Sequence, residues 1–255
     1  MAELLFWPAL VAYGEAAVAF GLGPGRAARL GQWGTRVGWL VQTALLALQA
    51  ARADGFPWAT WAGSLNLFVW LVVGAYMFWG CNARYRLVGL GVMPLAAVLL
   101  VAARLGGGTG TGTRSHYSNL FLVIHVGLVL AAFAGFTLAA ALSALYLWQE
   151  RRLKRRSADI LRLRLPALAT LEEVTWRTVA IALPALTFGI GAGLVRLQED
   201  GGGLDALMAV TFLTWLVYAG FLVARPTGRR AARLAIAGFA LVIVARLGLP
   251  LTHFS

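Results

Sequence analysis

Residues 120–154 read LFLVIHVGLVLAAFAGFTLAAALSALYLWQERRLK, a long apolar run that contains one histidine and ends in a cluster of basic residues. A helix needs roughly 20 apolar residues to cross the hydrocarbon core of a bilayer. The run therefore predicts a membrane-spanning helix over about residues 118–149, with His125 near one end and the basic cluster just beyond the other.

Seven more apolar stretches accompany this one, and together they predict an all-α, polytopic membrane bundle of about eight transmembrane helices. Their expected bounds are 4–22, 37–53, 61–81, 87–104, 174–196, 205–224 and 234–252. Composition agrees, because 60% hydrophobic residues with 13% charged ones leave too little polar surface to cover a soluble core. The short connections favour a single transmembrane domain over 1–255.

Basic residues are unevenly divided between the two sides of this bundle. The odd-numbered loops hold 16 of the 22 lysines and arginines, and the even-numbered loops hold 4. By the positive-inside rule the odd loops face the cytoplasm, so both termini are expected outside. All three histidines then lie at or near the outer surface. The net charge of +12 is assigned to helix ends beside anionic lipid headgroups, and nucleic acid is not expected as a partner.

Ionisable side chains within a bilayer are costly and mark candidate functional sites. His125 lies about two turns into its span, and His253 ends the last span. Two neutral imidazoles on facing helices are a usual way to hold a haem iron, although a histidine at a helix end is more often a solvated interface residue. Arg246 shares a helix face with His253 and lies about 10 Å deeper. It is placed to clamp a haem propionate, to form an ion pair with Glu15, or both.

Three weaker candidates lie on the same outer side. His116 precedes the fifth span and is either solvent-exposed or a substitute haem ligand. Trp58 and Trp61 either anchor the membrane interface or form a wall for a flat ligand. On the opposite side, the basic stretch 150–173 either lies on the membrane surface or docks a soluble partner. Nucleotide-binding and hydrolase motifs are missing from the sequence, so enzymatic activity is not expected.

Four segments resemble the cytochrome c assembly proteins of the CcsA/CcmC/HemX type, which handle haem at the outer face of bacterial and plastid membranes. The segments are 120–154, quoted above, LPALATLEEVTWRTVAIALPALTFGIGAG at 165–193, LDALMAVTFLTWLVYAGFLVAR with GRRAARLAIAGF over 204–239, and THFS at the end of the chain. FPWATWAGSLNLFVWLVVGAYM resembles an earlier family element more loosely, so residues 1–117 match loosely and 118–255 closely.

The resemblance implies that His125 and His253 are the axial ligands of a haem. The family has a tryptophan-rich outer loop, WGxxWxWDPKE, from which this sequence departs. The corresponding residues 196–205 contain no tryptophan and keep only Asp205. Val223 stands where some members have an intramembrane histidine. These losses argue against a full haem-attaching synthase and favour the shorter HemX-like branch.

The expected function is therefore that of a haem-handling protein of the bacterial cytoplasmic membrane that assists cytochrome c maturation or cytochrome assembly. It would bind b-type haem, in transit or lastingly, and contact the lipid bilayer and other assembly or cytochrome-complex proteins. Two alternatives stay open. One is a HemX-like regulator that docks a haem-biosynthesis enzyme through the loop around 150–165, and the other is a cofactor-free structural subunit of a membrane complex.

Overall fold

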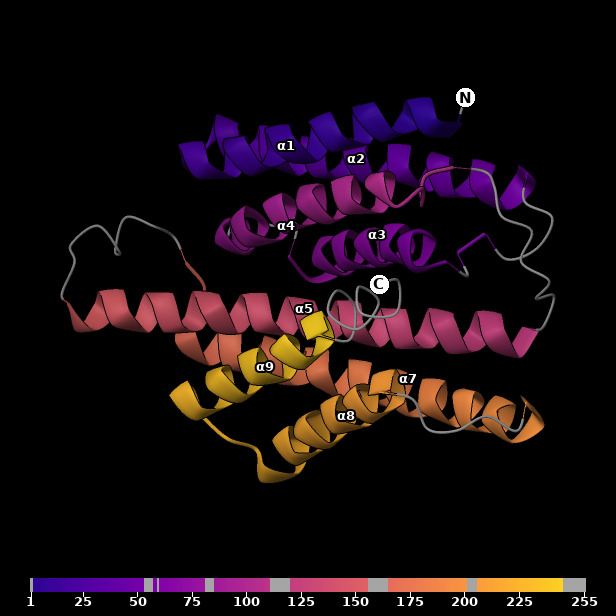
Figure 1. The fold of residues 1–255 in the computed structure, drawn as a ribbon. Coiled ribbons are helices and arrows are strands. Elements are labelled where there is room, and N and C mark those ends of the chain that lie inside the picture. Colours follow the sequence, from indigo (N-terminus) through magenta and orange to yellow (C-terminus); the bar gives the residue numbers. More distant parts are fainter. Residues whose placement is uncertain are drawn as a thin grey trace. The chain divides into compact units, whose positions relative to one another are not determined.

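The computed structural model describes residues 2–52, 57–58, 60–80, 85–110, 120–155, 165–200 and 206–244. These residues form one short 3-10 helix and eight α-helices (Figure 1), which confirms the all-α class. The elements are η1 (Ala2–Leu5), α1 (Phe6–Leu22), α2 (Arg26–Arg52), α3 (Trp61–Gly80), α4 (Arg86–Leu105), α5 (Leu120–Lys154), α7 (Leu168–Asp200), α8 (Ala206–Ala224) and α9 (Gly228–Ile243).

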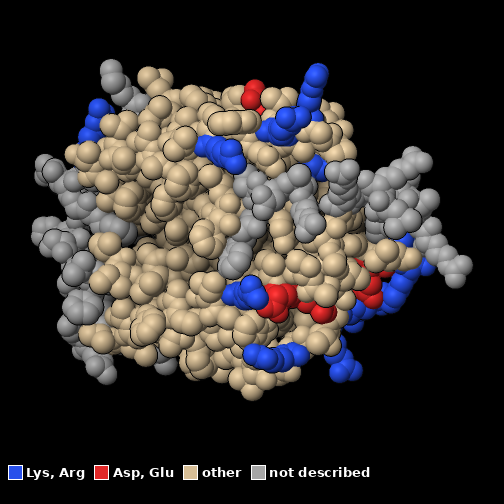
Figure 2. All heavy atoms as spheres, turned by 180° about the vertical axis from the view of Figure 1, so that it is seen from behind, with Lys and Arg blue, Asp and Glu red and all other residues tan. Residues whose placement is uncertain are grey.

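Five of these helices, α3, α4, α5, α7 and α8, are long and apolar enough to cross a membrane, and α1 is apolar but shorter. The chain is accordingly a multi-pass membrane protein. Much of the surface visible in Figure 2 is free of charged side chains, as lipid contact requires. The full count of eight spans and the outward position of both termini stay predictions.

Several helices extend beyond the apolar stretches that predicted them. Helix α2 begins at Arg26 where the apolar pattern began at 37, and α7 begins at Leu168 where the pattern began at 174. Arginine, glutamate and glutamine are good helix formers, so the backbone hydrogen-bond ladder continues through polar turns into the interfacial region. The apolar pattern therefore marks the part of a helix that lies in the hydrocarbon core, and the helix itself extends beyond that part.

The chain divides into two compact units, Met1–Ser118 and Asn119–Ser255. In the first, α1 packs on α2 and α4, and α3 packs on α4 (Figure 1). In the second, α5 and α7 lie side by side, α9 packs on α5, and α8 packs on α9 and α7.

Polar side chains in the core of the first unit hydrogen-bond to one another. Tyr13 donates its hydroxyl proton to Gln42 Oε1 at 2.7 Å, and Gln42 Nε2 donates to Asn66 Oδ1 at 2.9 Å. Asn66 Nδ2 donates to Gln49 Oε1 at 3.2 Å, and Gln49 Nε2 donates to the carbonyl oxygen of Gly108 at 3.0 Å. All four side chains are essentially inaccessible. A buried amide is tolerated only when it is paired in this way, so the network fixes the turn after α4 to α2 and α3.

Tyr218 of α8 connects three helices in the second unit. Its ring stacks on Phe136 of α5 with centroids 3.7 Å apart, and its hydroxyl donates to the carbonyl oxygen of Ala235 in α9 at 2.9 Å. A Cβ at Gly238 would lie 2.7 Å from the same ring, so glycine is needed at that position of α9. Tyr218, part of the segment LDALMAVTFLTWLVYAGFLVAR quoted above, is thus a packing residue that holds α5 and α9 in place.

Candidate functional site

His125 is the one predicted haem ligand that lies within the described residues. It is half-buried in the second turn of α5, and its Nδ1 lies 2.6 Å from the backbone carbonyl oxygen of Gly189 in α7. A carbonyl oxygen can only accept, so Nδ1 carries the proton and Nε2 of the neutral ring carries the lone pair. Histidines that bind metals commonly donate their second ring nitrogen to a carbonyl in this manner.

Two glycines of α7 make this contact possible. A Cβ at Gly193 would lie 2.7 Å from Cε1 and 2.9 Å from Nδ1 of His125, closer than packed atoms tolerate. Nε2 is further from that point, at 3.5 Å, so the ring presents its protonated edge to α7. At Gly191, which lies on another side of the helix, an added Cβ would meet nothing within 4 Å.

The role of Gly189 and Gly193 was not foreseen from the sequence. The signal was present, because residues four apart share one face of a helix and the segment GIGAG places two glycines at that spacing. The sequence does not say which residues of another helix pack against these two glycines. In the structure the imidazole of His125 packs against Gly193, whereas Gly189 packs against Val129 and supplies its carbonyl oxygen to His125.

The remaining predicted haem contacts, His116, Asp205, Arg246 and His253, lie outside the described residues. Their roles as ligands, propionate clamp or loop residue stay predictions, as does the ion pair between Arg246 and Glu15. Glu15 itself is exposed on α1.

Trp58 and Trp61 belong to the first unit and contact its polar network. The indole N–H of Trp58 donates to Gln49 Oε1 at 3.4 Å, and the Trp61 ring lies 3.1 Å from the position of a Cβ on Gly106. Both rings are half-buried against neighbouring parts of that unit. These contacts orient the two tryptophans, and their use as walls for a flat ligand stays a prediction.

The other end of α5 carries a basic surface. His125 and Ser143 are 18 residues apart on this helix, which corresponds to about 27 Å, close to the thickness of a hydrocarbon core. Beyond Ser143, Glu150 pairs with Lys154 at 2.9 Å and with Arg229 of α9 at 2.6 Å. Neighbouring basic side chains on the last turn of α5 are exposed. Figure 2 shows a charged part of the molecular surface on which basic and acidic side chains lie side by side. The candidate haem ligand and this basic surface thus lie near opposite faces of a bilayer.

Comparison with known proteins gives matches over most of the chain. The family model described as "Cytochrome C assembly protein" matches residues 58–253. The cytochrome c biogenesis protein CcsA of Microcystis aeruginosa is 26% identical over 277 residues, which cover 87% of this chain and 84% of the relative. The CcsA of Gloeobacter violaceus is 24% identical, covering 86% and 82%. Protein HemX of Brevibacillus brevis is 29% identical over 160 residues, covering 62% of this chain and 58% of the relative.

Proposed function

Because this chain belongs to the cytochrome C assembly protein family, we propose that it holds haem at one membrane surface during cytochrome c maturation. His125 and His253 are the two axial ligands of the iron in this proposal, and Arg246 binds a propionate. The protein acts as a carrier or accessory subunit and makes no covalent bond itself. Its haem is b-type, and its location is the cytoplasmic membrane of a bacterium.

The observation that carries the proposal is the hydrogen bond between His125 Nδ1 and the carbonyl oxygen of Gly189, 2.6 Å long. It holds the ring in the tautomer whose Nε2 lone pair is available to a metal, and it fixes the ring plane. A histidine that is merely solvated at the interface does not need Gly193, whose missing Cβ makes room for the ring. The donor chemistry at His125 therefore fits a haem iron.

Haem bound here would supply an iron whose two axial positions are filled by imidazole, which suits storage and delivery better than reaction with oxygen. The contribution of the chain is to orient His125 through Gly189, with Nδ1 as the donor and Nε2 facing away from that carbonyl. The relatives named cytochrome c biogenesis protein CcsA agree with a role in cytochrome c maturation.

The test is the visible spectrum and pyridine haemochrome of the detergent-purified chain, expressed with ample haem. We expect a Soret band of bis-histidine character that weakens in His125→Gly and in His253→Gly. Added imidazole should restore the band in His125→Gly, because the free base fills the vacated ligand position. His116→Gly serves as the comparison, since His116 is at most a substitute ligand.

A colourless wild type would contradict the proposal. So would a spectrum that is unchanged by both substitutions at His125 and His253. Loss of colour without rescue by imidazole would indicate that His125 supports the fold only.

A regulator of the HemX kind is the second candidate, favoured by the exposed basic residues at the end of α5 and by the HemX relative. Arg151, Arg152 and Arg155 are exposed there, and they are placed to dock an acidic surface of a soluble enzyme. Capture of such an enzyme by wild type and by His125→Gly alike, and its loss when the three arginines are replaced by glutamine, would favour this candidate.

A further inference from the structure

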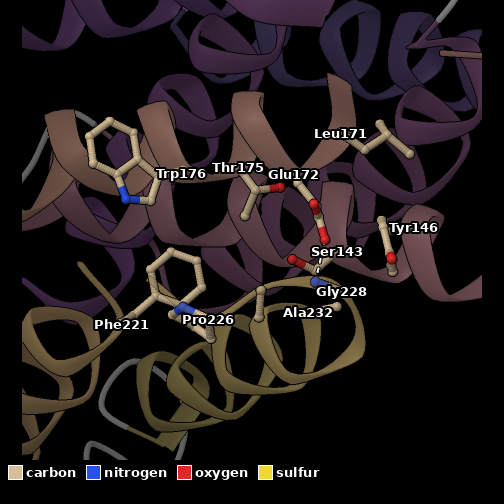
Figure 3. Close-up of a pocket in the computed structure, with 11 residues that line it drawn as sticks. Ser143, Tyr146, Leu171, Glu172, Thr175, Trp176, Phe221, Pro226, Gly228 and Ala232 are labelled. Carbon is tan, nitrogen blue, oxygen red and sulfur yellow. Dashed lines mark hydrogen bonds between the residues drawn. The ribbon is translucent and has the colours of Figure 1, made fainter. Parts of the chain in front are cut away.

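A small pocket lies in the second unit at the membrane-surface end opposite His125. Its walls come from the end of α5, the start of α7, the end of α8 and the start of α9 (Figure 3). About 30 Å³ in it is open to water-sized groups, which is room for one or two waters or a single ammonium group and far too little for a nucleotide or a porphyrin. The pocket therefore admits only the tip of a ligand.

The interior of the pocket offers hydrogen-bond acceptors. Glu172 and Ser143 both line it, and in Figure 3 both side chains point toward the start of α9, where Glu172 accepts the backbone N–H of Gly228. Ser143 is 2% exposed, and its hydroxyl has no hydrogen-bond partner among the described residues. Within the same part of the chain, Glu172 forms no ion pair. A buried hydroxyl and a carboxylate without a cation together favour a ligand that donates hydrogen bonds and carries positive charge.

The rim of the pocket has the opposite character. The guanidinium of Arg225 lies 4.6 Å from the centre of the Trp176 ring, and the indole N–H of Trp176 is buried with no acceptor within the described residues. Arg225 has a φ of 42°, a left-handed conformation that costs a residue with a side chain about 1 kcal/mol or more. The Trp176 donor and the positive charge of Arg225 beside the pocket favour an anionic group.

We propose that this pocket binds the headgroup of phosphatidylethanolamine, with the ammonium inside against Glu172 and Ser143 and the phosphate at the rim beside Arg225 and Trp176. Glu172 and Trp176 are four residues apart on α7, so their side chains begin about 5–6 Å apart. Two methylene groups separate the ammonium from the phosphate ester in ethanolamine, a length that matches this spacing. Lipid is the occupant because the pocket lies at the end of membrane-spanning helices, where headgroups are.

The pocket also distinguishes among headgroups. Phosphatidylglycerol has no cation to meet Glu172, and its net negative charge would face that carboxylate. Phosphatidylcholine carries three methyl groups on nitrogen, so it neither donates a hydrogen bond to Ser143 nor fits the small interior. An ion-pair and hydrogen-bond difference of this kind corresponds to roughly tenfold in affinity.

The experiment uses the full chain, reconstituted without haem in nanodiscs that contain equal parts of phosphatidylethanolamine, phosphatidylglycerol and phosphatidylcholine. Native mass spectrometry after detergent extraction counts the lipids that stay bound. We expect roughly tenfold enrichment of phosphatidylethanolamine in wild type. Glu172→Gln should abolish the enrichment while still accepting the N–H of Gly228, so α9 keeps its start. Ser143→Ala should reduce it.

Glu173→Gln is the matched control, because Glu173 is adjacent, exposed, and paired with Arg177 at 2.6 Å on another side of α7. It should leave the enrichment unchanged. Equal retention of phosphatidylethanolamine and phosphatidylcholine would overturn the proposal. Preference for phosphatidylglycerol that ignores Glu172→Gln would show that surface arginines alone attract lipid. Equal competition by water-soluble phosphoethanolamine would show that the pocket takes a free amine and not a lipid.

Discussion

Gly193→Ala should separate the folding of the chain from its capacity to orient His125. The new Cβ would lie 2.7 Å from the ring, whereas ordinary contacts begin at 3.4 Å, so the imidazole must move by about 0.7 Å. The hydrogen bond to the carbonyl oxygen of Gly189 is 2.6 Å long, and such a displacement stretches it to about 3.3 Å, which weakens it and turns the ring from its orientation.

The two energetic effects of this substitution nearly cancel in stability. Loss of a neutral hydrogen bond costs about 1 kcal/mol, and replacing glycine by alanine inside a helix returns about 1 kcal/mol. Haem binding has no such compensation, because altering a group that orients a metal ligand typically costs 10–100-fold in affinity. We therefore expect an almost unchanged unfolding midpoint and a clearly weaker haem titration, with a shifted Soret band.

Gly191→Ala is the control, since its Cβ meets nothing within 4 Å on the same helix. It should gain the same helix propensity and bind haem as wild type does. Coinciding haem titrations and Soret maxima of the two alanine variants would contradict this prediction. So would a difference in unfolding free energy between them clearly above about 1 kcal/mol, because the glycine would then serve packing alone.

Three further substitutions test other contacts. Tyr218→Phe keeps the aromatic stack but loses the bond to the carbonyl oxygen of Ala235, so the free energy of unfolding should fall by about 0.5–1.5 kcal/mol in a denaturant titration. Gln49→Leu removes the amide that donates to the carbonyl oxygens of Gly108 and Gly110 and should cost about 1–3 kcal/mol; an unchanged midpoint would mean the network is dispensable. Glu150→Gln removes two ion pairs whose cationic partners, Lys154 and Arg229, are exposed, so the unfolding midpoint should fall only slightly, a difference that high salt should erase.

Hydropathy located the helices well because bilayer thickness sets how long an apolar helix must be. It failed at helix ends such as the starts of α2 and α7, where charged residues with good helix propensity prolong the helix into the interface. It also could not divide the chain into two packed units.

The sequence predicted only part of the candidate site, because it does not show which helices contact one another. Residue type and depth identified His125, because ionisable groups in spans are rare. Its partner Gly189 lies 64 residues further along the chain, and Glu172 meets Gly228 across 56 residues. No local pattern encodes which helix faces which, so these contacts are tertiary information that the structure alone supplies.

Polar side chains in a membrane protein must be satisfied by one another or by something bound. In the first unit Gln42, Gln49 and Asn66 hydrogen-bond to one another, so folding alone accounts for these three. In the described part of the second unit, His125 commits one ring nitrogen to the protein and the Ser143 hydroxyl has no hydrogen-bond partner. It follows that substitutions in the first group should change stability while leaving haem affinity and lipid preference intact. A substitution at His125 should change haem affinity and leave lipid preference intact. A substitution at Ser143 should change lipid preference and leave haem affinity intact.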